Sequence, residues 1–359
     1  MTEQVTRHIP ANFGRSGVDS DAPAFFVDWL SLSQTHVLDL PIINAGVVQK
    51  MDVHGEIVWR TTAPSKVEGS HETSVQVRCD GHTVTFSGNV SRFGREDNVF
   101  GFDLATCLRR VNAILSRLGL PPFTAGLRYE RLVRTPGGLV PKVAYTGCHI
   151  TRIDLTANYE TGSMSNARAY MEWLATQQSG SRMKVGTFTD GETVDWGRGS
   201  RRLYAKVYLK ATEIRRHKGP EELAEWCESV GLVRFELTLK ATQLQGMGCN
   251  YLGSFDMGTV EQLFSEKRSV LTRAEHTHDD FEHLPNALRR TARDWIAGDD
   301  MRRRMSERTF RRHRADLLPY GIDIAVRRNV VNFVPRVRVI EVRAASVPSW
   351  YDLCERLAA

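Results

Sequence analysis

Residues 202–210 alternate between polar and apolar side chains, which predicts a β-strand with two different faces. The apolar face is formed by Leu203, Ala205, Val207 and Leu209. The opposite face carries Arg202, Tyr204, Lys206, Tyr208 and Lys210. Because like charges at neighbouring positions on one face repel, this row of cations and phenols favours a polyanion lying across the strand.

Two further segments repeat the pattern. In 232–240 the apolar side chains are Val233, Phe235, Leu237 and Leu239, and the polar face carries Arg234, Glu236, Thr238 and Lys240. In 150–157 the polar face carries Arg152, Asp154 and Thr156. If the three strands share one sheet, carboxylates and cations join the tyrosines on one face. Such a set suits metal-assisted nucleophilic attack on a phosphodiester.

The remaining pattern predicts an α+β protein. Strands are expected at 25–32, at 75–79 and 83–86 as a hairpin about Asp80-Gly81, and at 185–196 as a ribbon turning at Asp190-Gly191. Helices are expected at 104–118 with Asp103 as N-cap, at about 165–178, and at 221–229. The run 123–147 shows no clear pattern. The order indicates an antiparallel sheet with helices on one face.

The later part of the chain is helical and basic. Helices are predicted at 288–296 and 301–318, and residues 286–314 hold ten arginines, four acidic residues and no lysine. The stretch 305–318, with Ser306 as N-cap, resembles a helix-turn-helix. Arginine favours phosphate and guanine contacts, so we expect DNA contacts here, although a solvated charged face is the alternative. The residues expected to bind DNA are Arg308, Arg311, Arg312 and Arg314.

Composition adds mild support. The 359 residues carry a net charge of +6 and the pI is about 9.0, which favours a polyanionic partner but also fits an ordinary basic protein. No apolar run approaches the length of a membrane span, and the first residues lack the apolar core of a signal peptide. The six scattered cysteines favour reduced thiols. We therefore expect a cytoplasmic protein without a membrane partner.

Several segments resemble one family of proteins. They are T-R-I-D-L-T at 151–156, S-R-R-L-Y-A-K-V-Y-L-K-A-T-E at 200–213, L-V-R-F-E-L-T-L-K at 232–240, Asn98-Val-Phe-Gly101, 329–338 and Trp350-Tyr351. Together they resemble the replication initiators of filamentous phages, the gene II/gene X family. More distantly, they resemble the rolling-circle initiators of Gram-positive plasmids.

The resemblance implies an enzyme that nicks one strand of a duplex origin, forms a 5′-phosphotyrosyl link and later rejoins the displaced strand. The implied nucleophile is Tyr208, at the family's active position in V-x-Y-L-K. The implied partners are a double-stranded phage or plasmid origin, its displaced single strand, and a host helicase and DNA polymerase. The implied location is the cytoplasm of a bacterial host.

The other candidate residues share the tyrosine face. Asp154 and Glu236 are expected to bind Mg²⁺ or Mn²⁺, with Glu213 as a third ligand, unless they pair with their neighbours Arg152 and Arg234. Lys206 and Lys210 are expected to lower the pKa of the phenol or to hold the phosphate. Contacts to DNA are expected from Arg152, Tyr204, Lys206 and Arg234. The His-hydrophobe-His metal motif of many rolling-circle enzymes is absent, and His276-Thr-His278 is interpreted as part of a polar linker.

We divide the chain into an N-terminal α+β part (1–147), a catalytic nicking sheet (148–250), a basic helical region (251–328) and a returning C-terminal strand (329–359). Two other function classes stay open. One is an origin-binding repressor with an inert tyrosine face. The other is a tyrosine recombinase, for which His149-Ile-Thr-Arg152 offers an H-x-x-R pattern; that class makes a 3′-phosphotyrosine without metal.

Overall fold

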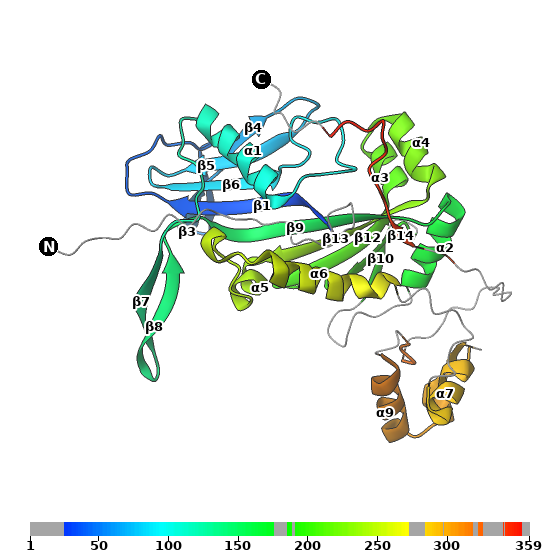
Figure 1. Cartoon of the computed structure of the whole chain (residues 1–359). Coiled ribbons are helices and arrows are strands. Elements are labelled where there is room, and N and C mark those ends of the chain that lie inside the picture. The colour runs from blue at the N-terminus through cyan, green and yellow to red at the C-terminus, as the bar shows by residue number, and fades with distance from the viewer. Residues whose placement is uncertain are drawn as a thin grey trace.

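The structure, a computed structural model, describes residues 25–175, 185–188, 191–272, 284–296, 298–318, 322–325, 340 and 342–353. Its centre is one antiparallel sheet (Figure 1) with the strand order β10-β11-β12-β13-β9-β1-β6-β5-β4, and β14 pairs with one end of β9. The strands are β1 (Phe26–Thr35), β4 (Ser65–Glu68), β5 (Ser74–Cys79), β6 (Thr83–Asn89), β9 (His149–Glu160), β10 (Val185–Phe188), β11 (Thr193–Trp196), β12 (Leu203–Leu209), β13 (Leu232–Lys240) and β14 (Arg343–Ala344).

The three strands with polar faces are neighbours in one sheet, which meets the condition set for their polar faces to converge. β13 lies between β12 and β9, and Glu236 stands opposite Lys206 on one side and Thr156 on the other. The predicted α+β class with an antiparallel sheet is therefore confirmed. On its other side β9 pairs with β1, so strands from both sides of residue 147 belong to the same sheet.

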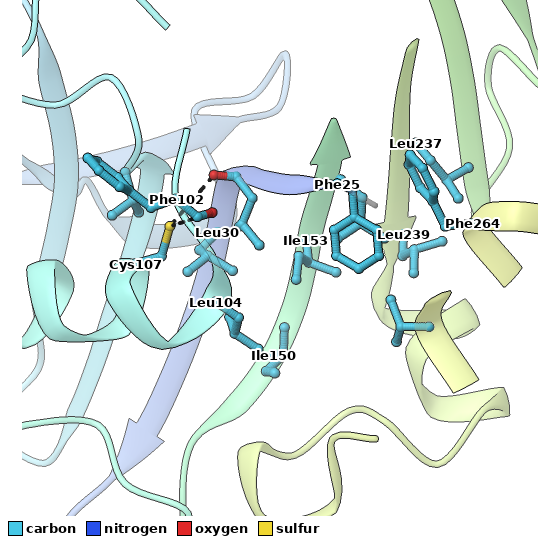
Figure 2. Close-up of a cluster of buried hydrophobic side chains, with 14 of the residues drawn as sticks. Phe25, Leu30, Phe102, Leu104, Cys107, Ile150, Ile153, Leu237, Leu239 and Phe264 are labelled. Atoms are coloured by element: carbon cyan, nitrogen blue, oxygen red, sulfur yellow. Dashed lines mark hydrogen bonds between the residues drawn. The ribbon is translucent and has the colours of Figure 1, made fainter. Parts of the chain in front are cut away.

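Four helices cover the apolar face of the sheet. They are α1 (Leu104–Arg117), α2 (Met164–Leu174), α5 (Ala241–Gly246) and α6 (Met257–Thr272). Their apolar side chains form one core with those of the strands, which Figure 2 shows around Ile153, Leu239 and Phe264. Burial of this surface is the main stabilising term of the fold.

Two shorter helices stand at one end of the sheet and form a separate core. α3 (Lys210–Arg216) follows β12 directly, and α4 (Glu221–Ser229) packs against it. Their apolar side chains surround Val99 and Phe100. The predicted strand 202–210 thus ends one residue early, because Lys210 is the first residue of α3.

Several local predictions are confirmed. Asp103 caps α1 by accepting a hydrogen bond from the Thr106 backbone N–H at 2.7 Å. The hairpin β5–β6 turns at Asp80-Gly81, where glycine adopts a φ of 105°. β13 and α4 have the predicted bounds. The ribbon 185–196 is present as β10 and β11, although residues 189–190 of its turn lie outside the described residues.

Two exposed hairpins were not predicted. They are β2 (Val47–Met51) with β3 (Ile57–Thr62), and β7 (Arg128–Thr135) with β8 (Gly138–Tyr145). Figure 1 shows β7–β8 projecting from the sheet. At its base the chain segments at Gly126 and Gly147 cross closely: a Cβ on Gly126 would lie 2.0 Å from the backbone nitrogen of Gly147. Only glycine permits this approach.

The basic region forms three helices: α7 (Asn286–Ile296), α8 (Met301–Arg304) and α9 (Glu307–Leu317). They enclose a small core that includes Trp295, Met301 and Phe310. The predicted helix 301–318 is broken at Met305, because Ser306 caps α9 and accepts from the Thr309 N–H. The segments 329–338 and His276–Asp280 lie outside the described residues. Within the predicted returning strand region, 329–359, the structure describes the short strand β14.

Within the described residues no helix is both long enough and apolar enough to cross a membrane. Cys79, Cys107, Cys148, Cys227 and Cys249 are buried free thiols.

Candidate active site

Tyr208 lies at the end of β12 on the polar face of the sheet. Its hydroxyl donates a hydrogen bond to Oε1 of Glu236 at 2.5 Å, and the ring lies under the Lys206 ammonium at 4.8 Å. The other oxygen of Glu236, Oε2, forms an ion pair with Nζ of Lys206 at 2.8 Å. A phenol, a carboxylate and a cation thus form one connected group across β12 and β13.

The protonation states within this group are set by burial and charge. Burial and the neighbouring Glu236 raise the pKa of Tyr208 well above its ordinary value. Burial acts to raise the pKa of Glu236 too, but the charges of Lys206 and Arg234 hold it below its usual range. The expectation that lysines lower the pKa of the phenol is therefore wrong. Instead, an ionised carboxylate is placed to accept the proton.

A cavity of about 200 Å³ opens beside Tyr208. Its polar lining includes Lys206, Glu213, Arg216 and His217. Arg216 is engaged by Glu192 at 3.0 Å. The cavity therefore places two basic side chains, Lys206 and Arg216, and two carboxylates, Glu192 and Glu213, beside an otherwise buried tyrosine.

Tyr204 occupies a different environment. Its hydroxyl donates to Oδ2 of Asp195 at 2.7 Å, and Arg198 pairs with the same carboxylate at 3.0 Å. Burial and Asp195 raise the pKa of Tyr204 to about 12. Tyr204 and Tyr208 therefore share a face but have separate carboxylate partners.

Arg234 is fully buried, although it was expected to contact DNA. Its guanidinium donates to the backbone oxygens of Asn98 and Val99, both at 2.6 Å, and to Oδ1 of Asn158 at 3.0 Å. The polar face is not bare at this end, because the loop 91–101 covers it. The structure corrects the prediction: Arg234 fixes this loop to the sheet.

Lys210 and Glu213 form a second buried group. The Lys210 ammonium binds Glu213 at 2.6 Å and Oδ1 of Asn98 at 2.8 Å. Burial lowers the pKa of Lys210, and the charge of Arg234 adds to this effect. Lys210 holds α3 to the loop 91–101 in this arrangement, so its own partners occupy the ammonium that was expected to serve the phenol or the phosphate.

Tyr351, near the C-terminus, also contacts the loop 91–101. Its hydroxyl donates to Oδ1 of Asp97 at 2.5 Å and accepts from Arg95 at 2.7 Å. Its ring packs edge-on against Phe100, with 5.1 Å between the ring centroids. Two of the segments that carry the family resemblance, 98–101 and 350–351, thus meet at one place, near the end of the sheet where Tyr208 lies.

The carboxylates on this face were also predicted to be metal ligands. Asp154 receives both Nε and Nη2 of Arg152, at 2.9 and 2.6 Å, so the alternative pairing with its neighbour is present. Asp28, from a bulge in β1, accepts from Asn98 at 3.2 Å. Burial raises the pKa of Asp28 and of Asp154, and Glu236 raises both further by repulsion.

This mutual repulsion suits a divalent cation, because oxygen ligands and negative charge are what Mg²⁺ and Mn²⁺ prefer. Among the described residues no three acidic, histidine or cysteine side chains converge within reach of one ion. Asp28, Asp154 and Glu236 thus have the oxygen ligands that a divalent cation prefers, but they do not converge on one ion in this arrangement, and Glu213 pairs with Lys210 instead.

Comparison with known proteins decides the family. Residues 26–258 match the family described as the N-terminal part of the phage replication-associated protein encoded by gene II, and residues 278–354 match the family described as its C-terminal part. The chain belongs to the gene II family of replication-associated proteins. The resemblance identified in the sequence is thereby confirmed.

Two curated members of the gene II family are similar over most of the chain. The replication-associated protein of Enterobacteria phage I2-2 is 29% identical in an alignment of 351 positions that covers 91% of this chain and 96% of the relative. The replication-associated protein of Escherichia phage If1 is 30% identical over 77% of this chain and 97% of the relative. A solved rolling-circle replication initiator from Geobacillus stearothermophilus aligns over 69% of this chain and 96% of its own, at 11% identity and a TM-score of 0.24.

The match to the C-terminal family includes the basic helices. Arg308, Arg311 and Arg312 are exposed on α9, and Arg311 pairs with Glu307 at 2.9 Å. Arg314 instead binds the buried Asp323 with both Nε and Nη2, at 2.6 and 2.8 Å. Three of the four arginines thus lie exposed on α9, one of them in a surface ion pair, and the fourth stabilises the helix cluster.

Sequence reasoning missed Asp28 and Asn98. Asn98 lies in a segment that carries the resemblance, and its side chain joins Asp28 to Lys210. Asp28 interrupts the apolar run Phe25–Leu32, and this interruption was the available signal of a bulge that turns a carboxylate to the polar face.

Proposed function

We propose that this gene II family protein initiates rolling-circle replication by nicking one strand of a duplex origin through Tyr208. The observation that supports this most directly is the hydrogen bond between the Tyr208 hydroxyl and the ionised Glu236, beside a cavity lined by both basic and acidic side chains. A nucleophile within hydrogen-bond distance of a base is the arrangement that covalent catalysis requires.

In the proposed reaction, Tyr208 Oη attacks the scissile phosphorus as Glu236 accepts the phenolic proton. The bond between phosphorus and the 3′ oxygen breaks, and that oxygen takes a proton from solvent. The products are a 5′-phosphotyrosyl link and a free 3′ hydroxyl, which a host polymerase extends after a host helicase opens the duplex. Rejoining is the reverse transesterification on the displaced strand. Lys206 offsets the charge that develops on the phosphate.

A metal is part of this proposal. Asp154 and Glu236 would hold Mg²⁺ or Mn²⁺, which would stabilise negative charge on the phosphate. Binding requires Arg152 to release Asp154, and Arg152 is free to turn outward because its side chain is 40% exposed.

DNA placement follows from the exposed cations. We propose that Arg308, Arg311 and Arg312 contact the duplex origin, while Arg152, Tyr204 and Lys206 face the strand at the sheet. We further propose that the protein acts in the cytoplasm of a bacterial host.

The test is capture of the covalent adduct on a labelled single-stranded oligonucleotide that spans the nick. Tyr208→Phe should abolish the adduct, because only the nucleophilic hydroxyl is lost, and Tyr204→Phe should retain it. Mass spectrometry should find a 5′-phosphate on Tyr208. If neither the wild type nor the two variants form an adduct, the result would support an origin-binding repressor. A 3′-phosphotyrosine would support a recombinase.

A further inference from the structure

A second cavity, of about 370 Å³, lies where the β7–β8 hairpin meets the start of β9. His149, the first residue of β9, lines this cavity. Tyr208 pairs with Arg234 of β13, and Arg234 pairs with Asn158, which lies near the other end of β9. The strand between these ends, from 149 to 158, corresponds to about 30 Å. The cavity is therefore separate from the nicking site.

Two cations meet at this cavity without acidic partners. Arg131 and Lys142 stand directly opposite each other on β7 and β8, and both line the cavity. Both side chains are exposed, and neither forms an ion pair with another described residue. Like charges in directly opposed positions destabilise a sheet. An anion bound between them would turn this repulsion into attraction.

The same cavity has aromatic walls. Tyr251 packs against Tyr145 with 5.6 Å between ring centroids and against His149 with 5.1 Å. Burial lowers the pKa of His149, so the imidazole is neutral near pH 7 and serves as a ring rather than as a charge. Asn250, with an amide that can both donate and accept, completes the polar lining.

We propose that this cavity binds one nucleotide of a single DNA strand, with the phosphate between Arg131 and Lys142 and the base against Tyr251. Cations that hold the backbone beside aromatic rings that stack on bases are the recurring features of single-strand binding. The inference rests on the proposed function, since the strand would be the one displaced at the origin. The cavity would hold that strand at a distance from Tyr208.

The hairpin supplies a matched control. Arg128 and Arg134 lie on the opposite face of β7, and neither lines the cavity. Arg131→Ala with Lys142→Ala removes the same charge as Arg128→Ala with Arg134→Ala. Affinity for a labelled oligothymidylate would be measured by fluorescence anisotropy over a range of salt concentrations. The first double variant should flatten the slope of log K against log salt by about 0.7, the value for one phosphate on a single strand. Equal losses in the two double variants would overturn the proposal.

Stacking is tested separately. Tyr251→Ala should weaken binding of the oligothymidylate by about fivefold or more, the effect of losing one stacked base, and Tyr251→Phe should keep wild-type affinity. Wild-type affinity in Tyr251→Ala would overturn the stacking role. A duplex of the same length distinguishes an unpaired nucleotide from a backbone contact: equal losses of duplex and single-strand binding would overturn the nucleotide site.

The cavity and the nicking site can fail independently. The Arg131→Ala, Lys142→Ala variant should still form the Tyr208 adduct at saturating oligonucleotide, which also shows that it is folded. A wild-type protein that forms the adduct but loses equal affinity in both double variants contradicts only the cavity. A wild-type protein that neither binds single strands nor forms an adduct contradicts both proposals.

Discussion

Replacement of Arg234 by methionine separates a structural from a DNA-binding role most sharply. The guanidinium is 0% exposed and donates to Asn98 O, Val99 O and Asn158 Oδ1. Methionine fills similar space but leaves two backbone oxygens without these donors, and it removes the positive charge near Asp28 and Glu236. Removing one partner from a buried charged group costs about 3–5 kcal/mol. That is a large part of the roughly 5–15 kcal/mol by which native proteins are stable.

The assay is urea unfolding followed by tryptophan fluorescence, with Arg202→Met as the control. Arg202 lies just before β12, is exposed, and its guanidinium donates to Gln243 at 3.0 Å, so its loss should change the free energy of unfolding by about 1 kcal/mol or less. A direct phosphate contact by Arg234 predicts the reverse: unchanged stability and a DNA-binding salt slope flatter by about 0.9. That result would refute the buried role assigned here.

Three further predictions concern the site and the basic helices. Glu236→Gln removes the proton acceptor and one proposed metal ligand, so adduct formation should slow at saturating Mn²⁺ and should rise about tenfold per pH unit below the phenol pKa, whereas the wild-type rate should fall only when acid protonates Glu236; parallel pH–rate profiles would argue against a base. Mn²⁺ should raise the melting temperature of the wild type but not of Asp154→Ala, read by calorimetry without DNA; an equal rise in both would remove Asp154 from the metal site. Arg311→Ala and Arg312→Ala should each flatten the duplex salt slope by about 0.9, and Arg314→Ala should instead destabilise the helix cluster through Asp323; unchanged slopes would make α9 a solvated face.

The elements that sequence reasoning located are those with one apolar and one polar face. β12, β13 and residues 152–157 of β9 alternate between polar and apolar side chains because one face packs against α2, α5 and α6, and so their positions could be inferred. The hairpins β2–β3 and β7–β8 are exposed along most of their length, so burial imposes no alternation and leaves no pattern to detect.

The site was only partly predictable for a related reason. A polar strand face predicts exposure, because charged residues are seldom buried. Here the loop 91–101 covers Arg234 and Lys210, and that loop is distant in sequence from both. No local pattern reports such a contact, whereas the carboxylate beside Tyr208 follows from strand register and was within reach.

The contact of Tyr351 with the loop 91–101 means that the order of synthesis determines when this loop can be fixed beside Tyr208. The strands that carry Tyr208 and Glu236 leave the ribosome more than a hundred residues before Tyr351 does. A nascent chain can therefore pair β9, β12 and β13 while the loop that covers Arg234 still lacks its C-terminal partner. Arg95, Asp97 and Phe100 can meet around one phenol only once Tyr351 has been synthesised, so the loop 91–101 should become fixed well after the strands that it covers.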